Sequence, residues 1–290
     1  METNLPSRRF FAYFSLLVIT LAAICIFPKS GVRAQQNSPD SYADWKLIWS
    51  DEFNGPAGSP DPVKWTFNVG HNGWGNHELE NYTTRNARLD GMGHLIISAL
   101  WDKDAAFPYT SARILTHKLF SVQYGMIEAR MKLPAGPGLW PAFWMLGENI
   151  SSVGWPKCGE IDIMENVPQL GPSQIASSLH APFVNSGNVY NISRHYHFPS
   201  GQTILGFHTY GMIWTPQEIS FFIDDPQNIF ITYTRAYVEN RSGIWAFDHP
   251  FFIILNLAVG GDWPGKPNNT TVFPAQMVVD YVRVYQRENP

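Results

Sequence analysis

After residue 44 the chain is a succession of short runs rich in β-branched and aromatic residues, each bounded by glycine, proline, asparagine or aspartate. Such runs are typical of strands, and the residues between them are typical of turns. The runs are HLIISAL, YGMIEARMKL, GEIDIMENV, HTYGMIWT, ISFFIDD, PFFIILNLAV and MVVDYVRVYQ. No stretch has the sustained apolar period of an amphipathic helix. The sequence therefore predicts an all-β fold, either a sandwich or a jelly roll.

Side-chain alternation and turn-rich segments refine this prediction. Residues 125–132 alternate between two sets of side chains, which predicts a strand with one buried face and one wetter face. Residues 134–158 and 181–203 are instead rich in turn-forming residues. Loops of that length in a compact domain usually carry function. We expect both segments to form the walls of a binding cleft.

Size and charge limit the classes of partner. A chain of 290 residues, 44% of them hydrophobic, can enclose one large core, so a single domain over residues 44–290 is expected. The formal net charge is −4 with no run of like charges, so neither nucleic acid nor an anionic membrane surface is an expected partner. Aromatic residues make up 14% of the chain and include 11 Trp, more ring surface than a core usually needs. We expect a monomer that binds a neutral ligand.

The N-terminal residues have the pattern of a secretory signal peptide. Arg8 and Arg9 precede an apolar run over residues 10–27, and a small-x-Ala site ends at Ala34. This predicts a signal peptide over residues 1–34, a polar tether over residues 35–43 and a secreted domain after it. The apolar run also approaches the length of a membrane span, so an uncleaved membrane anchor is the alternative.

Cysteines and sequons give weaker signals. Cys25 lies inside the apolar run, so cleavage leaves Cys158 alone, without an internal disulfide and expected as a small packed side chain. Six sequons would be acceptors for glycans in a eukaryotic secretory pathway. They begin at Asn81, Asn149, Asn191, Asn240, Asn268 and Asn269. Such tripeptides also recur by chance, so the set is compatible with secretion and indicates no more.

Residues 159–166 place three carboxylates in one otherwise apolar, strand-like segment, Gly-Glu-Ile-Asp-Ile-Met-Glu-Asn. Burying unpaired charges is costly, which favours a functional explanation. On a regular strand Glu160 and Asp162 share a face, whereas Glu165 points the opposite way. A bulge around Ile163 and Met164 would bring Glu165 onto the face of the other two. We predict this bulge, and with it a floor lined by three acids.

Paired carboxyl groups are the machinery of glycoside hydrolysis. A retaining glycosidase needs two of them about 5–5.5 Å apart, one to attack the anomeric carbon and one to protonate the leaving oxygen. Like-charge crowding around Asp162 should raise at least one pKa, which predicts Glu160 as the ionised nucleophile and Glu165 as the protonated acid. On spacing alone, a calcium cluster or an acidic outer strand face is an equally good interpretation. The flanking tryptophans favour the glycosidase.

Around this cluster the chain resembles glycoside hydrolase family 16, in particular its laminarinase-like endo-β-1,3-glucanases. The similarity spans nearly all of the chain after the tether. It is carried, in family order, by residues 49–55, 75–83, 109–114, 138–145, 154–156, 160–165, 207–210, 255–265 and 279–285. Met164 matches the bulged motif of laminarinases and not the unbulged motif of licheninases and xyloglucan transferases.

The resemblance implies a curved antiparallel β-sandwich, a concanavalin-like jelly roll with an open substrate cleft across its concave face. It implies Glu160 as nucleophile, Glu165 as acid/base and Asp162 as helper, with no cofactor required for catalysis. The implied function is a secreted, retaining endo-glucanase that hydrolyses β-1,3-glucan polysaccharide of the laminarin type, with mixed β-1,3/1,4 chains as a further substrate.

Three alternatives use the same scaffold: a β-glucan-binding recognition protein, a transglycosylase and a galactan hydrolase. The presence of both Glu160 and Glu165 disfavours the recognition protein, whose relatives have lost these acids. Residues 75–78 and 261–265 resemble laminarinases, which favours glucan over galactan. Sequence does not decide between water and a sugar as acceptor.

Candidate substrate-binding residues are rings and fixed polar groups. Trp140, Trp144, Trp155 and Trp263 can stack on the apolar face of a sugar. Strand alternation places Trp140 and Trp144 on one face, which we expect to be the cleft; core packing is the alternative. Hydroxyl-binding candidates are Asn76, Glu80, Arg113 and Asn256, each with a turn or ion-pair role as the alternative. His180 is expected to hydrogen-bond the catalytic carboxylates unless it is purely structural.

The resemblance also implies a structural calcium on the convex side of the sandwich. Glu52, Gly93 and Asp280 match its ligand positions, some of them through backbone oxygens, which suit calcium. With only one acidic side chain near each end of the domain, an empty site is the alternative.

Overall fold

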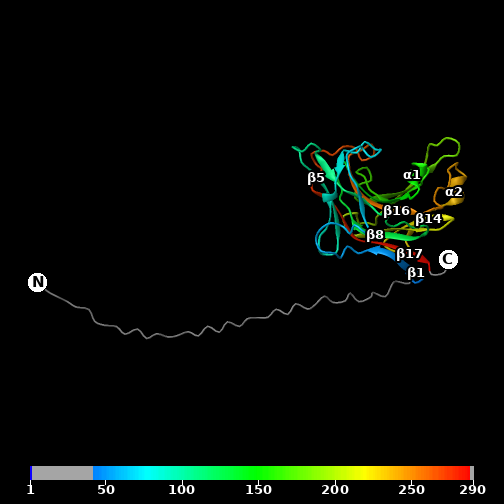
Figure 1. Ribbon diagram of the computed structural model, residues 1–290, viewed down its shortest axis with the longest axis horizontal. Coiled ribbons are helices and arrows are strands. Elements are labelled where there is room, and N and C mark those ends of the chain that lie inside the picture. Colours follow the sequence, from blue (N-terminus) through cyan, green and yellow to red (C-terminus); the bar gives the residue numbers. More distant parts are fainter. Residues whose placement is uncertain (2–41, 288–290) are drawn as a thin grey trace, which may run out of the picture. The chain divides into compact units, whose positions relative to one another are not determined.

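The computed structural model describes residue 1 and residues 42–287, so the predicted signal peptide and most of the tether lie outside the described residues. In this part of the chain, the strands form two large sheets that pack face to face (Figure 1). Helical structure here is confined to short segments such as α1 (Ile150–Val153), α2 (Arg235–Glu239) and the 3-10 helix η2 (Thr84–Asn86). No helix of the described residues has the length and hydrophobicity to cross a membrane. The all-β prediction is confirmed.

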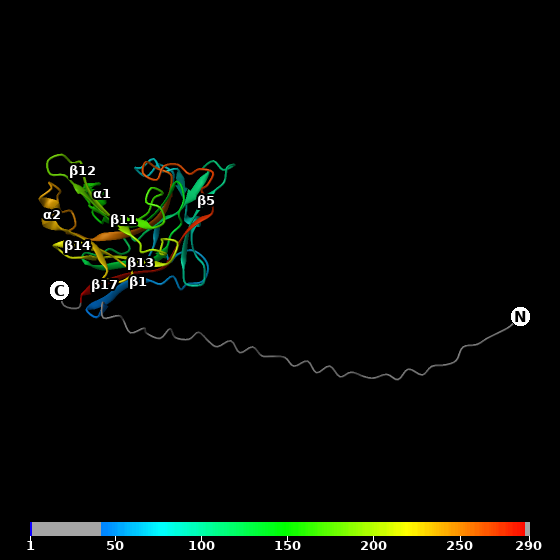
Figure 2. The ribbon, with the colours of Figure 1, turned by 180° about the vertical axis from the view of Figure 1, so that it is seen from behind.

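The first sheet has ten strands. Along its main path lie β15 (Ile229–Thr234), β14 (Glu218–Ile223), β13 (His208–Trp214), β8 (Gly125–Lys132), β17 (Ala275–Arg287), β5 (Leu95–Trp101), β6 (Tyr109–Ser111) and β3 (Glu80–Tyr82), while β1 (Trp45–Asp51) pairs with β17 and β4 (Ala87–Leu89) pairs with β5. Figures 1 and 2 show β8 and β17 in the lower layer and β5 rising well above them. The sheet is therefore strongly curved, as expected for a jelly roll.

The second sheet has seven strands, all paired antiparallel. Their order is β12 (Val189–His197), β11 (Gln174–Pro182), β10 (Glu160–Glu165), β9 (Leu139–Gly147), β16 (Phe251–Val259), β7 (Arg113–Leu115) and β2 (Thr66–Asn68). The core lies between the two sheets and includes fully buried side chains from both, such as Ile127, Met131, Phe143 and Met145. This second sheet carries the acidic cluster.

Each of the seven runs predicted as strands overlaps one, namely β5, β8, β10, β13, β14, β16 and β17. The prediction of two long loops is wrong in part, because residues 134–158 contain β9 and residues 181–203 contain β12. Strand β9 pairs on both sides, with β10 and β16, so sheet pairing overrides the local turn propensity. Strand β12 is the edge of its sheet, where polar side chains are common because one side has no pairing partner.

The predicted wetter face of residues 125–132 is covered in part. Glu128 is fully buried, and its carboxylate accepts hydrogen bonds from the hydroxyls of Tyr42 at 2.7 Å and Tyr285 at 3.3 Å. Burial raises the pKa of Glu128, and the two hydroxyl donors act in the opposite direction. Met126 on the same face is also buried. The N-terminal residues of the domain therefore cover a surface that alternation alone assigns to solvent.

Two of the three residues predicted for a calcium site form ion pairs with arginines. Glu52 accepts hydrogen bonds from Arg283 at 2.8 and 2.9 Å, and Asp280 accepts one from Arg130 at 2.7 Å. A calcium ion would have to compete with both guanidinium groups for these carboxylates. Gly93 has a φ of 96°, which favours glycine in that turn without any ligand. The two carboxylates are thus held by guanidinium groups as they are arranged, whereas these contacts leave the backbone-oxygen ligands untested, so the calcium site stays a prediction.

Cys158 is buried in a small apolar cluster with Leu146 and Phe252. Burial raises the pKa of its thiol to about 11, which keeps the sulfur protonated and unreactive at neutral pH. The interpretation of Cys158 as a packed side chain is confirmed.

Candidate active site

A bulge in β10 aligns the three acids. Asp162 pairs with Trp144 on β9, whereas Glu165 pairs with Ala142, and the register shifts between Asp162 and Met164. A matching shift occurs against β11 between Asp162 and Glu165. The extra residue lets Ile163 and Met164 both enter the core, so Glu165 returns to the face of Asp162. The bulge prediction is confirmed.

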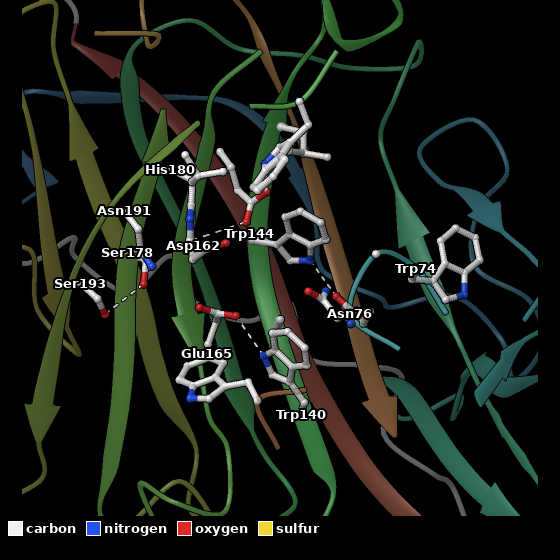
Figure 3. A pocket seen from close by; sticks show the side chains of 18 of the residues that line it. Trp74, Asn76, Trp140, Trp144, Asp162, Glu165, Ser178, His180, Asn191 and Ser193 are labelled. Carbon is white, nitrogen blue, oxygen red and sulfur yellow. Dashed lines mark hydrogen bonds and ion pairs between the residues drawn. The ribbon is translucent and has the colours of Figure 1, made fainter. Parts of the chain in front are cut away.

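The acids lie in a cleft of about 840 Å³. Figure 3 shows His180, Asp162 and Glu165 following one another through its middle. Trp74 and Asn76 lie to one side of them, and Asn191 and Ser193 to the other (Figure 3). We call these two parts the Trp74 end and the Asn191 end. An occupant could therefore extend in both directions from the acids.

Strand β9 supplies one wall of the cleft through alternate residues. Trp140, Ala142, Trp144 and Leu146 all line it, so the prediction that Trp140 and Trp144 share the cleft face is confirmed. Between the two large rings, the small Ala142 lies opposite Glu165. This arrangement leaves space for the carboxyl group between two indoles.

Glu160 is held by a ring donor and a neighbouring cation. The indole Nε1 of Trp155 donates a hydrogen bond to Glu160 Oε2 at 2.8 Å. The Nε2 atom of His180 lies 3.8 Å from Glu160 Oε1 and 3.0 Å from Asp162 Oδ2. These contacts fix the orientation of the Glu160 carboxylate and link it to Asp162 through one imidazole.

Glu165 has its own indole donor. Trp140 Nε1 donates a hydrogen bond to Glu165 Oε1 at 2.9 Å (Figure 3). The Trp140 ring meets the Trp263 ring edge-on, with centroids 5.5 Å apart. Glu165 is 7% exposed, and what remains accessible faces the cleft. Each of the two glutamates is thus oriented by a different tryptophan.

At the Trp74 end a guanidinium lies between two rings. The Cζ atom of Arg113 is 4.6 Å from the ring centroid of Trp144 and 5.3 Å from that of Trp74, which are cation–π distances. Trp144 Nε1 donates to Asn256 Oδ1 at 2.7 Å, and Asn76 Nδ2 donates to Glu78 Oε1 at 3.1 Å. Polar groups and aromatic faces therefore alternate along this end, as a polyhydroxylated ligand requires.

Comparisons with known proteins agree with this geometry. Residues 64–283 match the sequence profile described as Glycosyl hydrolases family 16. The chain belongs to this family. A β-glucanase of Rhodothermus marinus is 41% identical over an alignment of 256 residues that covers 85% of this chain and 87% of that protein.

Solved structures of the family have the same fold. The laminarinase catalytic domain of Thermotoga maritima superposes with a TM-score of 0.77 at 42% identity, covering 85% of this chain and all of that one. The endo-β-1,3-glucanase of Pyrococcus furiosus superposes with a TM-score of 0.76 at 45% identity, covering 84% of this chain and 95% of that one. The chain is therefore a family-16 glycoside hydrolase with the family's jelly-roll fold. Its chemistry needs no cofactor, since two carboxyl groups can supply both nucleophile and proton.

Protonation states in this family-16 site follow from burial and close charges. Burial and, after it, Asp162 raise the pKa of Glu160 to about 8, against the lowering effect of His180 and the Trp155 N–H. Burial also raises the pKa of Glu165 well above its ordinary value, again with a contribution from Asp162. Burial lowers the pKa of His180, but its interactions with Asp162 and Glu160 outweigh this and raise it to about 9. His180 is therefore a cation at neutral pH.

The predicted site residues that line the cleft are Asn76, Arg113, Trp140, Trp144, Trp155, Glu160, Asp162, Glu165, His180, Asn256 and Trp263. Glu80 is the exception, and its assignment to sugar hydroxyls is wrong. Its side chain is 0% exposed, and its Oε2 accepts a hydrogen bond from the backbone N–H of Val259 at 2.7 Å. Residue 80 belongs to a paired strand and lies one step deeper than Glu78, which lines the cleft in its place.

Sequence reasoning missed further lining residues at both ends: Trp74, Glu78, Ser178, Asn191, Ser193 and His195. Three of them alternate along β12, and a period-two polar pattern on an edge strand could have revealed them. Trp74 directly precedes the block that begins at Gly75. Ser178 hydrogen-bonds Ser193 at 3.1 Å (Figure 3), so the Asn191 end has a polar floor.

Proposed function

We propose that this family-16 hydrolase is a retaining endo-β-1,3-glucanase with Glu160 as nucleophile and Glu165 as acid/base. The observation that carries the proposal is the β10 bulge, which places Glu165 on the face of Asp162 in the middle of a cleft that extends both ways. A cleft that extends past the acids suits cleavage inside a polymer. The β-glucanase, laminarinase and endo-β-1,3-glucanase relatives support laminarin-type β-1,3-glucan as substrate, with mixed-linkage chains as a second one.

In the first step the Glu160 carboxylate attacks the anomeric carbon and the bond to the leaving oxygen breaks. Glu165 gives its proton to that oxygen, so the released fragment carries a new hydroxyl group. In the second step Glu165, now a carboxylate, removes a proton from water, and the resulting hydroxide attacks the same carbon and frees Glu160. Two inversions at one carbon retain the β configuration.

The charges of the site suit this sequence of steps. Glu160 must be ionised to attack; burial raises its pKa to about 8, and the nearby His180 cation and the Trp155 N–H act against burial and favour the carboxylate. Glu165 must hold a proton, and burial together with Asp162 favours its neutral form. Asp162 lies 3.0 Å from His180, so it keeps the imidazole charged and in place. Asp162 raises and His180 lowers the pKa of both glutamates, so the proposed roles require Glu160 to be the first of the two to lose its proton.

The direct test compares the wild type with Glu160→Gln on laminarin, mixed-linkage glucan, agarose and carrageenan. We expect the wild type alone to release reducing ends from the two glucans, with the β-anomer appearing first by NMR. Glu239→Gln is the matched control, because Glu239 lies on α2 in an exposed pair with Arg235. Binding of laminarin without cleavage would favour a recognition protein, and cleavage of a galactan alone would overturn the substrate. Transfer to a sugar acceptor in place of water would identify a transglycosylase.

We also propose that the enzyme acts outside the cell. The N-terminal pattern of Arg8 and Arg9, an apolar run and a site at Ala34 supports a cleaved signal peptide. Among the sequon asparagines, Asn191, Asn240, Asn268 and Asn269 are exposed and could accept glycans in a eukaryotic pathway, although Asn191 lines the cleft. Sequencing the N-terminus of the protein from culture medium tests this: a start at Gln35 is expected, and retention of Met1 on membranes would identify an anchor.

A further inference from the structure

In each of the two catalytic glutamates, one carboxyl oxygen accepts a hydrogen bond from an indole N–H and the other does not. Trp140 donates to Oε1 of Glu165 at 2.9 Å, and Trp155 donates to Oε2 of Glu160 at 2.8 Å. An indole nitrogen is a donor only, so the oxygen that it contacts must offer a lone pair. For an ionised carboxylate both oxygens do so equally. For a protonated carboxyl group the carbonyl oxygen is the better acceptor.

We propose that Trp140 is a positioning residue that determines which oxygen of Glu165 carries the catalytic proton. With Oε1 accepting from the indole, the acidic hydrogen is placed on Oε2, where it can be donated into the cleft. This inference rests on the proposed role of Glu165 as acid/base. It gives Trp140 a function in proton transfer, distinct from the sugar stacking that its position alone suggests.

The Trp140 indole is held in place without any substrate. Its backbone is inside β9, where it pairs with Ala258 of β16. Its ring packs on the buried cluster of Val167, Leu170 and Ala176 and meets Trp263 edge-on. Since packing fixes the ring, the N–H direction is set before a ligand binds, as electrostatic preorganisation requires.

The same hydrogen bond strengthens as the reaction proceeds. When Glu165 releases its proton, its carboxylate becomes a charged acceptor, and charge-assisted hydrogen bonds are roughly twice as strong as neutral ones. Trp140 therefore stabilises the transition state of the first step more than the resting enzyme. It also lowers the pKa of Glu165, against the larger effect of burial.

The test compares two substrates, one whose leaving group must be protonated by Glu165 and one whose leaving group departs without a proton. In Trp140→Phe we expect kcat/KM on laminarin to fall about 10- to 100-fold, the effect of one hydrogen bond to a charged group. On a dinitrophenyl β-laminaribioside, whose phenolate leaves unprotonated, we expect kcat/KM within about 3-fold of wild type. The alkaline limb of the laminarin profile should move to higher pH, because loss of the donor raises the pKa of the acid.

Two further variants separate loss of the Trp140 N–H from other effects of the substitution. Replacing Trp140 with benzothienylalanine keeps the ring shape and removes only the N–H, so it should reproduce the leaving-group dependence even if Trp140→Phe folds poorly. Trp155→Phe removes the donor to the nucleophile and should slow both substrates alike. Equal losses on both substrates for the Trp140 variants would show that the ring only binds sugar, and wild-type rates on laminarin would also overturn the proposal.

Failure of the proposed function has a different signature. Glu165→Ala should lose laminarin hydrolysis and, on the dinitrophenyl substrate, form a β-glycosyl azide when azide is added. If Glu165→Ala hydrolyses laminarin at the wild-type rate, the acid/base assignment itself is wrong. If it behaves as expected and the Trp140 variants show no leaving-group dependence, only the inference about Trp140 fails.

Discussion

His180 Nε2 lies 3.0 Å from Asp162 Oδ2 in a largely buried ion pair between neighbouring strands β10 and β11. The same nitrogen is 3.8 Å from Glu160 Oε1. One cation thus lies between the carboxylate that must attack and the carboxylate that does not. Removing the charge of His180 should therefore act mainly on the pKa of the nucleophile, Glu160.

The first prediction concerns His180→Gln. Loss of the cation raises the pKa of Glu160, so the acidic limb of the kcat/KM profile on laminarin should move to higher pH. We expect kcat/KM to fall about 10- to 100-fold at neutral pH, since one charged partner near the nucleophile is lost. His94→Gln is the matched control, because His94 pairs with Asp90 at 2.8 Å and does not line the cleft. An unmoved acidic limb would contradict the role of His180.

The second prediction concerns stability and Glu160→Gln. The folded-state pKa of Glu160, raised by burial to about 8, exceeds the ordinary value of 4.5. The folded protein thus binds this proton more tightly than the unfolded chain, so the wild type loses stability as pH rises from 4.5 towards 8. A neutral glutamine avoids that loss. We expect it to raise the free energy of unfolding by on the order of 1–3 kcal/mol at pH 7.5, and by much less at pH 4.5.

Urea unfolding at both pH values measures the effect. The expected gain is partial, because His180 and Trp155 lose a charged partner in the variant. Glu239→Gln, in an exposed pair on α2, should show no gain at either pH. Equal stabilisation of Glu160→Gln at both pH values would refute the linkage argument.

The third prediction concerns Glu80, buried below the Trp74 end. Burial and the neighbouring Glu78 raise its pKa to about 9, so it is neutral at pH 7 and Glu80→Gln should preserve KM. Glu80→Ala leaves the Val259 N–H without its acceptor and should cost about 1–3 kcal/mol of stability in urea unfolding. A raised KM for Glu80→Gln would show that the ionised form of Glu80 is required, and the argument would fail.

What the sequence could predict depends on how locally each feature is encoded. The buried strands were predictable, because runs such as 251–259 are apolar throughout. The bulge was predictable, because two strand faces cannot otherwise accommodate acids at 160, 162 and 165. Strand β9 was anticipated only through the alternation of Trp140 and Trp144, since turn-forming residues surround it and one partner, β16, is distant in sequence. Strand β12 was missed although its partner β11 directly precedes it, because the polar side chains of an edge strand resemble those of a loop.

The Glu80 error has the same origin. Residues 78 and 80 both suit a sugar site by type, and only the depth of β3 in the fold separates the one that lines the cleft from the one that is buried. Likewise, the ion pairs Glu52–Arg283 and Asp280–Arg130 join residues far apart in the chain. Sequence chemistry identifies candidate ligands, whereas tertiary packing decides which of them are available.

The last prediction tests the bulge by changing the number of residues between Asp162 and Glu165 by one. Deleting Met164 leaves Glu-Ile-Asp-Ile-Glu, in which the three acids alternate regularly and stay on one face without a bulge. Inserting one alanine after Met164 instead gives an extra residue that the existing bulge cannot absorb, and Glu165 would point towards the core. The deletion should therefore retain hydrolysis of the dinitrophenyl laminaribioside, although loss of a buried methionine costs about 2–5 kcal/mol of stability. The insertion should lose activity on every substrate, and circular dichroism should establish that both variants fold. An inactive but folded deletion variant would show that the bulge does more than restore the face of Glu165, because it would then also set the spacing of the two catalytic carboxyl groups.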